Sequence, residues 1–543
     1  MPLTILRTQA FQACRRLLSE ENRDPYSPSY GCFDRRFWGW KIVDYPEATY
    51  QRNAYALAWL LRHPDPCLEI RADILTDAVQ AALRYTASIQ HGDGSFDQTF
   101  PHEHSFGATA FLLHPLLEAF LAVRETGSTE FRGTVERCLR RAADFLCRHD
   151  EQHGRISNHV AGAALSLRGA ADVFGEARYG KRSDELIEQV AASQSAEGWF
   201  PEYEGSDPGY QTLCLYYLAK LYGRRPDSQL KTALERAVEF LSWFAHPDGT
   251  FGGEYGSRRT AVFYPGGLAL LAREIPLAAS LFRFMADSIA AGRTVTLQDV
   301  DVANVAPVLE NYLAALDADP IDTKDGGAPL PCQADHAGRD FAQAGIYIRG
   351  TRRYYALLGV SNGGVLKVFD REGKKAIWND GGYAGQTASG EWITTQVTDL
   401  DRTCTATPTH ISLETPFFLL SRTSPTPGRF LLLRSMNLTV MRSIRIGNLV
   451  KKLLVQLLMT GKRQAPLTLV RTVEFGTETV TVCDRISGRL SLRWLECGRA
   501  FVAIHMASAR YFEGATGDGT VEIRRIDVEA LNRSGTFEHR VDI

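Results

Sequence analysis

Residues 195–221 read SAEGWFPEYEGSDPGYQTLCLYYLAKL and contain a glycine turn, a short polar and aromatic stretch, and an apolar segment, in that order. The apolar segment has the hydrophobic period of a helix. Asp207 can cap this helix, and Pro208 stands at its first position, where a proline is favoured. The pattern therefore places Tyr210 in the first helical turn, near the positive end of the helix dipole.

The same order of features recurs in three other stretches, which begin at His91, Glu151 and His246. The turn glycines are 60, 44 and 51 residues apart, at Gly94, Gly154, Gly198 and Gly249. This spacing fits one helical hairpin per repeat and predicts a closed ring or a solenoid. Equivalent loops of such an array lie at one end, so the polar residues before each inner helix are expected to converge on one cleft. Those residues are His102 and His104; Asn158 and His159; Glu204 and Tyr210; and Tyr255, Arg258, Arg259 and Tyr264.

The hydrophobic period changes along the chain. Residues 1–318 are predicted to be a helical domain, and residues 319–340, rich in Asp, Gly and Pro, are predicted to be a linker. From 341 to 543 the period is two, and short strands separated by turn residues predict an antiparallel sandwich. Residues 429–441, RFLLLRSMNLTVM, are interpreted as one of these strands.

One basic segment, RSIRIGNLVKKLLVQLLMTGKR at 442–463, has a helical period within the β domain. Our first interpretation is a helix packed against the sandwich. The alternative is a surface helix that docks on anionic lipid or polymer, which would give the protein a peripheral membrane contact.

Composition excludes several classes of protein. The 543 residues include 61 basic and 63 acidic side chains, so there is no global field for nucleic acid, and a polyanion must be recognised by a local patch. The ten cysteines form no CxxC pair, which excludes a zinc ribbon or a redox motif. The N-terminus predicts an amphipathic helix rather than a signal peptide, and no run of 18 apolar residues occurs. We therefore expect a cytoplasmic protein, with periplasmic or exported locations left open.

Residues 197–222, together with SNHVAGAALSL from Ser157, resemble heparinase II/III-like polysaccharide lyases and related alginate lyases. Asn158 and Tyr210 are 52 residues apart, close to the spacing of the matching Asn-His and Tyr motifs in that family. NGGVLKVFDREGKKAIWNDGGYAG, 362–385, resembles the sandwich stretch that closes over the family's cleft. The resemblance implies an incomplete α/α toroid followed by an antiparallel β-sandwich, with the substrate between them.

The chain departs from the family in its sandwich. Many members carry an H-x-H-x-D cluster there, which supplies a base or binds zinc, whereas this chain has Asn362, Gly363 and Gly364 in the comparable region. We therefore assign no metal and no cofactor. A structural zinc or calcium ion in the sandwich is left open, but no ligand pattern indicates one.

The predicted cleft contains the residue types needed to remove the C5 proton of a uronic acid. That proton is acidic enough only if donors neutralise the neighbouring carboxylate. Asn158 is predicted to be such a donor, with His159 or His104 as a second donor or the base. Tyr210 is predicted to shuttle the proton, with a pKa lowered by the helix N-terminus and a nearby arginine. The predicted substrate-binding residues are Arg258, Arg259, Glu204, Trp199, Tyr255 and Tyr264.

Each of these residues also has a structural explanation. An Asn-His pair can cap a helix, tyrosines and tryptophans are usually core, and an arginine pair can be solvated. The leading hypothesis is a polysaccharide lyase that cleaves a uronic-acid-containing polysaccharide by β-elimination. The alternatives are a C5-epimerase in exopolysaccharide or capsule assembly, a glycoside hydrolase using Glu202 and Glu204, and a non-catalytic glycan-binding protein. The expected partner is an acidic polysaccharide or oligosaccharide rather than nucleic acid, and the sequence carries no information on the oligomeric state.

Overall fold

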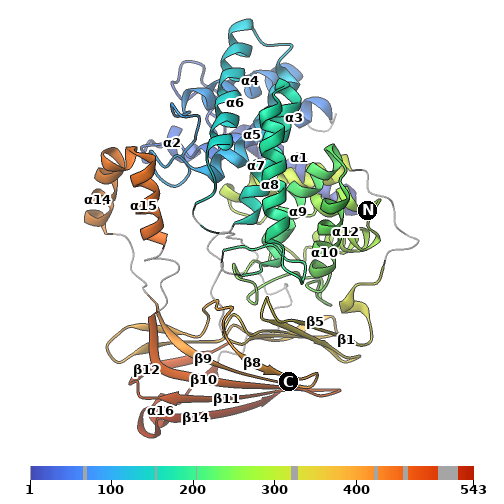
Figure 1. Cartoon of the computed structure of the whole chain (residues 1–543), viewed down its shortest axis with the longest axis vertical. Coiled ribbons are helices and arrows are strands. Elements are labelled where there is room, and N and C mark those ends of the chain that lie inside the picture. Colours follow the sequence, from blue (N-terminus) through green and yellow to red (C-terminus); the bar gives the residue numbers. More distant parts are fainter. Residues whose placement is uncertain are drawn as a thin grey trace.

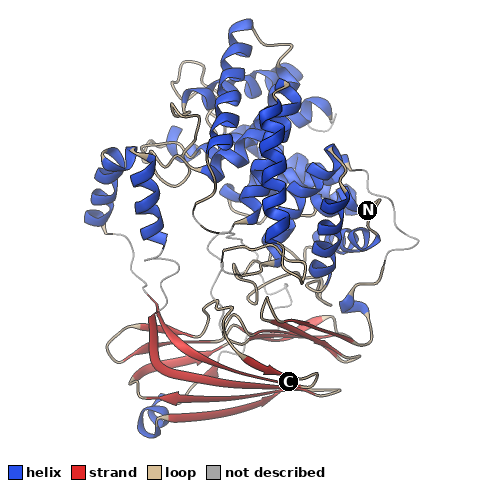
Figure 2. Cartoon of the chain, viewed as in Figure 1, coloured by secondary structure: helices blue, strands red, loops and turns tan. Residues whose placement is uncertain are grey.

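The computed structural model of the chain describes residues 2–64, 70–152, 154, 156–203, 205–318, 328–420, 426–455, 463–498 and 524–543. Helices gather at one end of the molecule and strands at the other (Figures 1 and 2). The last helix of the helical part ends at Asp317, and the first strand begins at Ala337.

The helical part is built from inner and outer helices. The inner helices are α3 (Ala54–Arg62), α5 (Phe106–Val123), α7 (Ser157–Phe174), α9 (Pro208–Arg224), α11 (Gly266–Leu271) and α13 (Val305–Asp317). Each contacts the next in this series. The outer helices, which pack on the inner ones, are α4 (Ala72–Ser88), α6 (Thr129–Arg148), α8 (Ala177–Ser193), α10 (Ser228–Ser242), α12 (Pro276–Ala290) and α1 (Pro2–Glu20). The predicted α/α toroid is therefore confirmed.

The circuit of inner helices is more complete than the sequence suggested. We expected an incomplete toroid, but α13 returns to contact α3. The short helix η1 (Ala48–Asn53), which precedes α3, supplies Arg52, whose guanidinium makes two 2.8 Å hydrogen bonds to the carboxylate of Glu310 on α13. Trp59 Nε1 also donates to Asp317 Oδ1 at 2.8 Å. These contacts join the two ends of the helical part.

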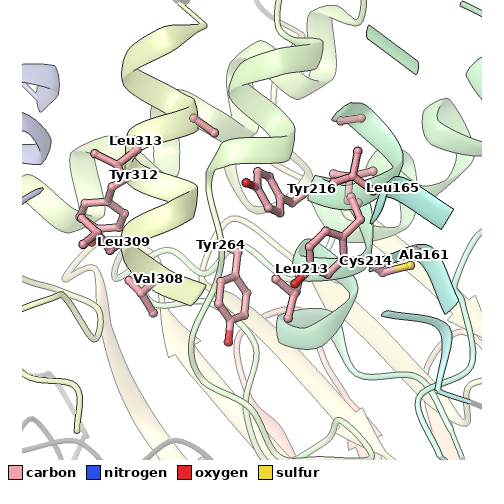
Figure 3. Close-up of a cluster of buried hydrophobic side chains, with 14 of the residues drawn as sticks. Ala161, Leu165, Leu213, Cys214, Tyr216, Tyr264, Val308, Leu309, Tyr312 and Leu313 are labelled. Carbon is pink, nitrogen blue, oxygen red and sulfur yellow. The ribbon is translucent and has the colours of Figure 1, made fainter. Parts of the chain in front are cut away.

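The toroid core lies between the inner helices. Leu165 on α7, Tyr216 on α9 and Leu309 on α13 are all buried in it (Figure 3). Helix α5 is apolar enough along its whole length to resemble a membrane span, but 78% of it is buried inside the protein. It is apolar all round because it is an inner helix surrounded by its neighbours.

The repeated glycine turns are present. Gly94, Gly198 and Gly249 have φ angles of 99°, 98° and 90°, which favour glycine. A Cβ at Gly198 would lie 2.3 Å from the carbonyl oxygen of Arg236 on the adjacent outer helix. The turns therefore need glycine for both conformation and space, and this explains why the sequence repeats it.

The strands form two antiparallel sheets within the described residues. The first has the order β1-β2-β3-β4-β5 and the second the order β13-β12-β6-β7-β9-β10-β11-β14, with β8 paired to β9. The bounds are β1 (Ala337–Phe341), β2 (Ile346–Gly350), β3 (Tyr354–Gly359), β4 (Val365–Asp370), β5 (Lys375–Asp380), β6 (Tyr383–Thr387), β7 (Trp392–Thr394), β8 (Cys404–Ala406), β9 (His410–Leu420), β10 (Arg463–Phe475), β11 (Val480–Gly488), β12 (Leu492–Cys497), β13 (Arg524–Arg525) and β14 (Thr536–Asp542).

The two sheets pack face to face. Leu358 and Val368 of the first sheet share a buried cluster with Leu413 and Val482 of the second. The opposite face of the first sheet, including Leu357, joins the core of the toroid. The first sheet is thus buried on both sides, between the helices and the second sheet, and the predicted antiparallel sandwich is confirmed.

A buried ion network joins the end of β5 in the first sheet to β10 and β11 in the second. The Arg471 guanidinium donates to both carboxylate oxygens of Asp484 at 2.7 Å and lies 2.9 Å from Asp380. None of these three side chains is more than 1% exposed. Removing Arg471 would leave Asp484 buried without its cation, and Asp380 would keep only Arg524, at 3.4 Å.

A helical hairpin interrupts the sandwich between β9 and β10. It consists of α14 (Pro427–Leu438), η5 (Val440–Arg442) and α15 (Ile444–Val455). The prediction of a strand at 429–441 is wrong, because the Thr426 hydroxyl accepts a hydrogen bond from the Arg429 backbone N–H and Pro427 opens a helix.

The interpretation of 442–463 as a helix packed against the sandwich is also wrong for its described part. The hairpin extends toward the toroid (Figure 1). Arg434 of α14 pairs with Asp44 at 2.9 Å, and Asn448 Nδ2 donates to Gln152 Oε1 at 3.1 Å. Residues 456–462 of this segment lie outside the described residues.

Candidate active site

A cavity of about 660 Å³ lies where the inner helices of the toroid begin. Its walls come from η1, the loops before α5, α7, α9 and α11, the start of α13, and Leu433 of the hairpin. Among the residues predicted from the sequence, those that line it are Asn158, His159, Tyr210, Arg258 and Tyr264. The equivalent loops of successive repeats therefore meet at one place, as the repeat pattern predicts.

Glu202 links two of these residues. Asn158 Nδ2 donates to one oxygen of its carboxylate at 2.7 Å, and Arg258 Nη1 lies 2.9 Å from the other. Burial raises the pKa of Glu202 to about 7, although the Arg258 charge acts in the opposite direction. The carboxylate thus holds an amide and a guanidinium side by side in the cavity wall.

Tyr210 stands in the first turn of α9, as predicted. The Asp207 carboxylate caps this helix by accepting from the Tyr210 backbone N–H at 3.0 Å. It also accepts from the backbone N–H of Arg258 at 2.9 Å. One capping residue therefore fixes the tyrosine and the arginine relative to each other, and the guanidinium lies 4.6 Å from the centre of the Tyr210 ring.

The predicted fall in the pKa of Tyr210 is wrong for this site. Burial of the hydroxyl raises its pKa above the ordinary value for tyrosine, and the nearby Glu202 and Asp207 carboxylates add to the rise. The Arg258 charge lowers the pKa but does not offset burial. Tyr210 is consequently a neutral phenol, a proton donor, at neutral pH.

His159 is oriented by a buried carboxylate. Its Nδ1 lies 2.6 Å from Oε2 of Glu151, whose side chain is 3% exposed. Because an ionised carboxylate only accepts, this contact places a proton on Nδ1 and leaves Nε2 as the acceptor of the neutral ring. Gly107 makes room for the ring, since a Cβ there would lie 2.8 Å from it.

Other predicted residues lie elsewhere. The His104 ring contacts Asp93 and Ser95, each at 2.8 Å, outside the cavity lining. Arg259 donates to the Gln396 carbonyl of the β domain. The Trp199 indole is in the core and donates to Glu197 at 3.0 Å. The Tyr255 hydroxyl contacts Nε2 of buried His246 at 2.8 Å. Glu204 lies outside the described residues.

Glu202, Glu151 and Tyr203 are among the residues of the cavity wall to which sequence reasoning gave no role in elimination. Glu202 was considered only as a hydrolase carboxylate, while Glu151 and Tyr203 were not considered at all. Glu151 lies eight residues before His159, at the start of the same repeat, so a search for a carboxylate partner of that histidine could have found it. Tyr203, whose ring centre is 4.4 Å from the Arg258 guanidinium, has no comparable signal.

The sandwich contacts the loop that carries Arg258. Asn362 Nδ2 donates to the carbonyls of Glu254 and Gly256, at 2.9 and 2.7 Å, in the loop that carries Arg258. Lys367 Nζ lies 2.8 Å from the Glu254 carboxylate. The segment that resembles the family's sandwich stretch therefore fixes the arginine loop rather than supplying a side chain to the cavity.

Residues 72–269 match the family model of the Ulvan lyase N-terminal domain, a span that runs from α4 into α11 and includes Asn158, His159, Tyr210 and Arg258. A search of curated proteins finds no match.

Solved structures of polysaccharide lyases share the architecture. Chondroitin AC lyase of Streptomyces coelicolor A3, in complex with chondroitin sulphate, has 11% identity and a TM-score of 0.57, over 91% of this chain and 67% of that chain. A point mutant of that enzyme gives a TM-score of 0.53 at the same identity and coverage. At this identity the likeness shows the fold alone. Residues 72–269 of the chain thus match an Ulvan lyase N-terminal domain, and the chain has the toroid-and-sandwich fold that chondroitin AC lyase also has.

Proposed function

We propose that the chain cleaves a uronic-acid-containing acidic polysaccharide by β-elimination in this cavity. The observation that carries the proposal is the convergence of Asn158, His159, Tyr210 and Arg258 on one cavity, within the span that matches an ulvan lyase domain. Amide, guanidinium, imidazole and phenol are together the groups that this reaction needs.

Asn158 and Arg258 would neutralise the uronate carboxylate. The Asn158 amide has two N–H donors and gives one to Glu202, and the guanidinium has five donors, of which Glu202 engages one. The remaining donors can bind a substrate carboxylate without breaking the Glu202 contacts. Donors that strengthen as charge flows from C5 into that carboxylate stabilise the transition state, and this is what makes the C5 proton removable.

His159 would be the base and Tyr210 the acid. His159 Nε2 takes the C5 proton, and the electron pair of the C5–H bond forms the C4–C5 double bond. The C4–O4 bond breaks, and the Tyr210 hydroxyl protonates the departing O4 oxygen. Transfer of the proton from the imidazolium to the tyrosinate, through solvent, restores both groups. The raised pKa of Tyr210 suits this role, because the hydroxyl carries its proton at neutral pH.

The direct test is the ultraviolet absorbance of the purified protein with ulvan, chondroitin sulphate and heparan sulphate. Elimination conjugates the new double bond with the carboxylate, so absorbance rises on a substrate and on no other polymer. If absorbance stays flat on every polymer that binds, the proposal is wrong. Exchange of the C5 proton for deuterium would then identify an epimerase, and no exchange would identify a glycan-binding protein.

A further inference from the structure

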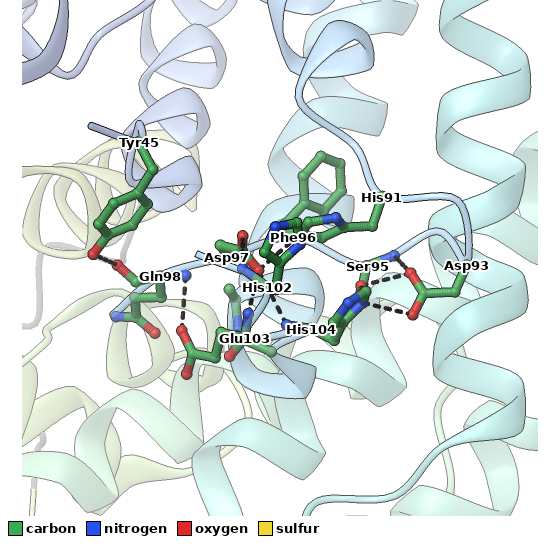
Figure 4. Close-up of polar contacts among 12 residues, drawn as sticks. Tyr45, His91, Asp93, Ser95, Phe96, Asp97, Gln98, His102, Glu103 and His104 are labelled. Carbon is green, nitrogen blue, oxygen red and sulfur yellow. Dashed lines mark hydrogen bonds and ion pairs between the residues drawn. The ribbon is translucent and has the colours of Figure 1, made fainter. Parts of the chain in front are cut away.

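Three histidines meet beside the cavity, in the loop that leads into α5. His91, His102 and His104 each present a ring nitrogen, and these nitrogens all lie within 4.8 Å of one another (Figure 4). None of the three lines the cavity, so the proposed elimination does not use them.

The loop is folded so as to bring the three rings together. The Asp97 carboxylate accepts from the backbone N–H groups of His102 and His104, at 2.8 and 3.0 Å. His102 and His104 both have positive φ angles, 60° and 52°, which are uncommon for residues other than glycine. The surrounding contacts hold this costly conformation, and its result is the histidine cluster.

The ring spacing suits a shared metal ion. Zinc binds an imidazole nitrogen at about 2.0–2.1 Å in tetrahedral geometry, which places the centres of two bound rings roughly 5 Å apart. The ring centres of His91 and His102 are 5.5 Å apart, and those of His91 and His104 are 4.3 Å apart. Small side-chain rotations would therefore bring the rings into coordination geometry.

Carboxylates already occupy the positions of outer-shell partners. Asp97 Oδ1 lies 2.8 Å from Nε2 of His91, and Asp93 Oδ2 lies 2.8 Å from Nδ1 of His104. Ser95 Oγ also contacts Nδ1 of His104 at 2.8 Å. Histidines that bind metals through one nitrogen commonly donate the other N–H to a carboxylate, which orients the ring.

We infer that His91, His102 and His104 form a site for a divalent transition-metal ion of the zinc class. Three imidazoles suit zinc, and the fourth position would be taken by water. The ion would stabilise the part of the cavity wall that contains Glu103, the residue between His102 and His104. Its carboxylate accepts from the backbone N–H groups of Gln98 and Thr99, at 2.9 and 2.6 Å, and all three residues line the cavity. A metal on the neighbouring histidines would brace this wall without touching the reacting atoms.

The test is direct metal binding by the full chain, prepared without a histidine tag and stripped with a chelator. Titration with Zn²⁺ against a chromophoric indicator should give one equivalent of tight binding, and Zn²⁺ should raise the unfolding temperature. His102→Gln and His104→Gln should each weaken binding at least about tenfold, since losing even outer-shell partners costs 10–100-fold.

His149→Gln is the matched control, because its Nδ1 lies 3.0 Å from the carbonyl of Phe145, one turn earlier in the chain, and it lies outside the cluster. This variant should bind Zn²⁺ as the wild type does. Circular dichroism of each variant separates loss of the site from loss of the fold. Absence of stoichiometric binding by the wild type, or equal binding by folded His102→Gln and His104→Gln, would overturn the inference. Neither outcome depends on lyase activity.

Discussion

Replacing Glu202 with glutamine should make the protein more stable at alkaline pH and less active. In the folded protein, burial raises the pKa of this carboxyl from 4.5 to about 7. A rise of that size corresponds to roughly 3 kcal/mol. Since the folded pKa lies above the unfolded one, protonation of Glu202 favours folding. The stability that the protonated Glu202 carboxyl adds to the folded protein is fully present below about pH 4.5 and is lost as pH rises through about 7.

Glutamine resembles the protonated acid at every pH. At pH 9 we therefore expect the free energy of unfolding of Glu202→Gln to exceed that of the wild type by up to about 3 kcal/mol. Near pH 4.5 the two free energies should be equal. Turnover at pH 8 should fall, because Asn158 and Arg258 lose the anionic acceptor that holds them. The measurements are urea unfolding at both pH values and initial rates at pH 8. If Glu202→Gln is less stable than the wild type at pH 9, the pair with Arg258 outweighs the burial penalty, and the reasoning is refuted.

Three further changes test the fold and the hairpin. Arg471→Met leaves buried Asp484 without its cation and Asp380 with only Arg524, so the free energy of unfolding in urea should fall by about 3–5 kcal/mol. An unchanged midpoint would contradict the network. Gly198→Ala should lower the unfolding temperature, because φ is positive there and the new Cβ would lie 2.3 Å from the Arg236 carbonyl oxygen. Gly223→Ala, in a helix with open space around it, should not lower it. Equal effects of the two substitutions would contradict this account. The alternative interpretation of the basic segment, docking on anionic lipid, is tested at the exposed leucines of the hairpin, in a stretch (415–473) whose sequence has no acidic residue. Wild-type protein should sediment with anionic vesicles and not with neutral ones, and Leu431→Ser with Leu449→Ser should abolish this; sedimentation that ignores vesicle charge would contradict the docking.

The fold was predictable wherever one hydrophobic period ran undisturbed. The helical repeats predicted the toroid correctly because their turns need glycine: Gly94 and Gly198 combine a positive φ angle with a close backbone contact. The leucine-rich stretch at 429–441 was misassigned because short apolar runs fit a strand or a helix equally well. The contact of Arg52 with Glu310 spans 258 residues, and no local pattern reveals such a pair.

The sequence predicted which loops form the site, but it predicted less well which side chains of those loops face the cavity. The repeat pattern correctly brought Asn158, His159, Tyr210 and Arg258 together, because equivalent loops of the toroid share one end. It gave no information on which way each side chain points, so Arg259 was grouped with Arg258 although it faces the sandwich. The pKa of Tyr210 was misjudged because burial, which the sequence does not show, outweighs the arginine.

The most direct test of the central claim compares Tyr210→Phe with Tyr312→Phe. Tyr312 is buried on α13, and its hydroxyl has no hydrogen-bond partner among the described residues, so its removal should leave activity unchanged. Tyr210→Phe removes the hydroxyl assigned as the acid. Its kcat for elimination should fall at least about 100-fold, with little change in polysaccharide binding. Retention of wild-type kcat by Tyr210→Phe would contradict the account.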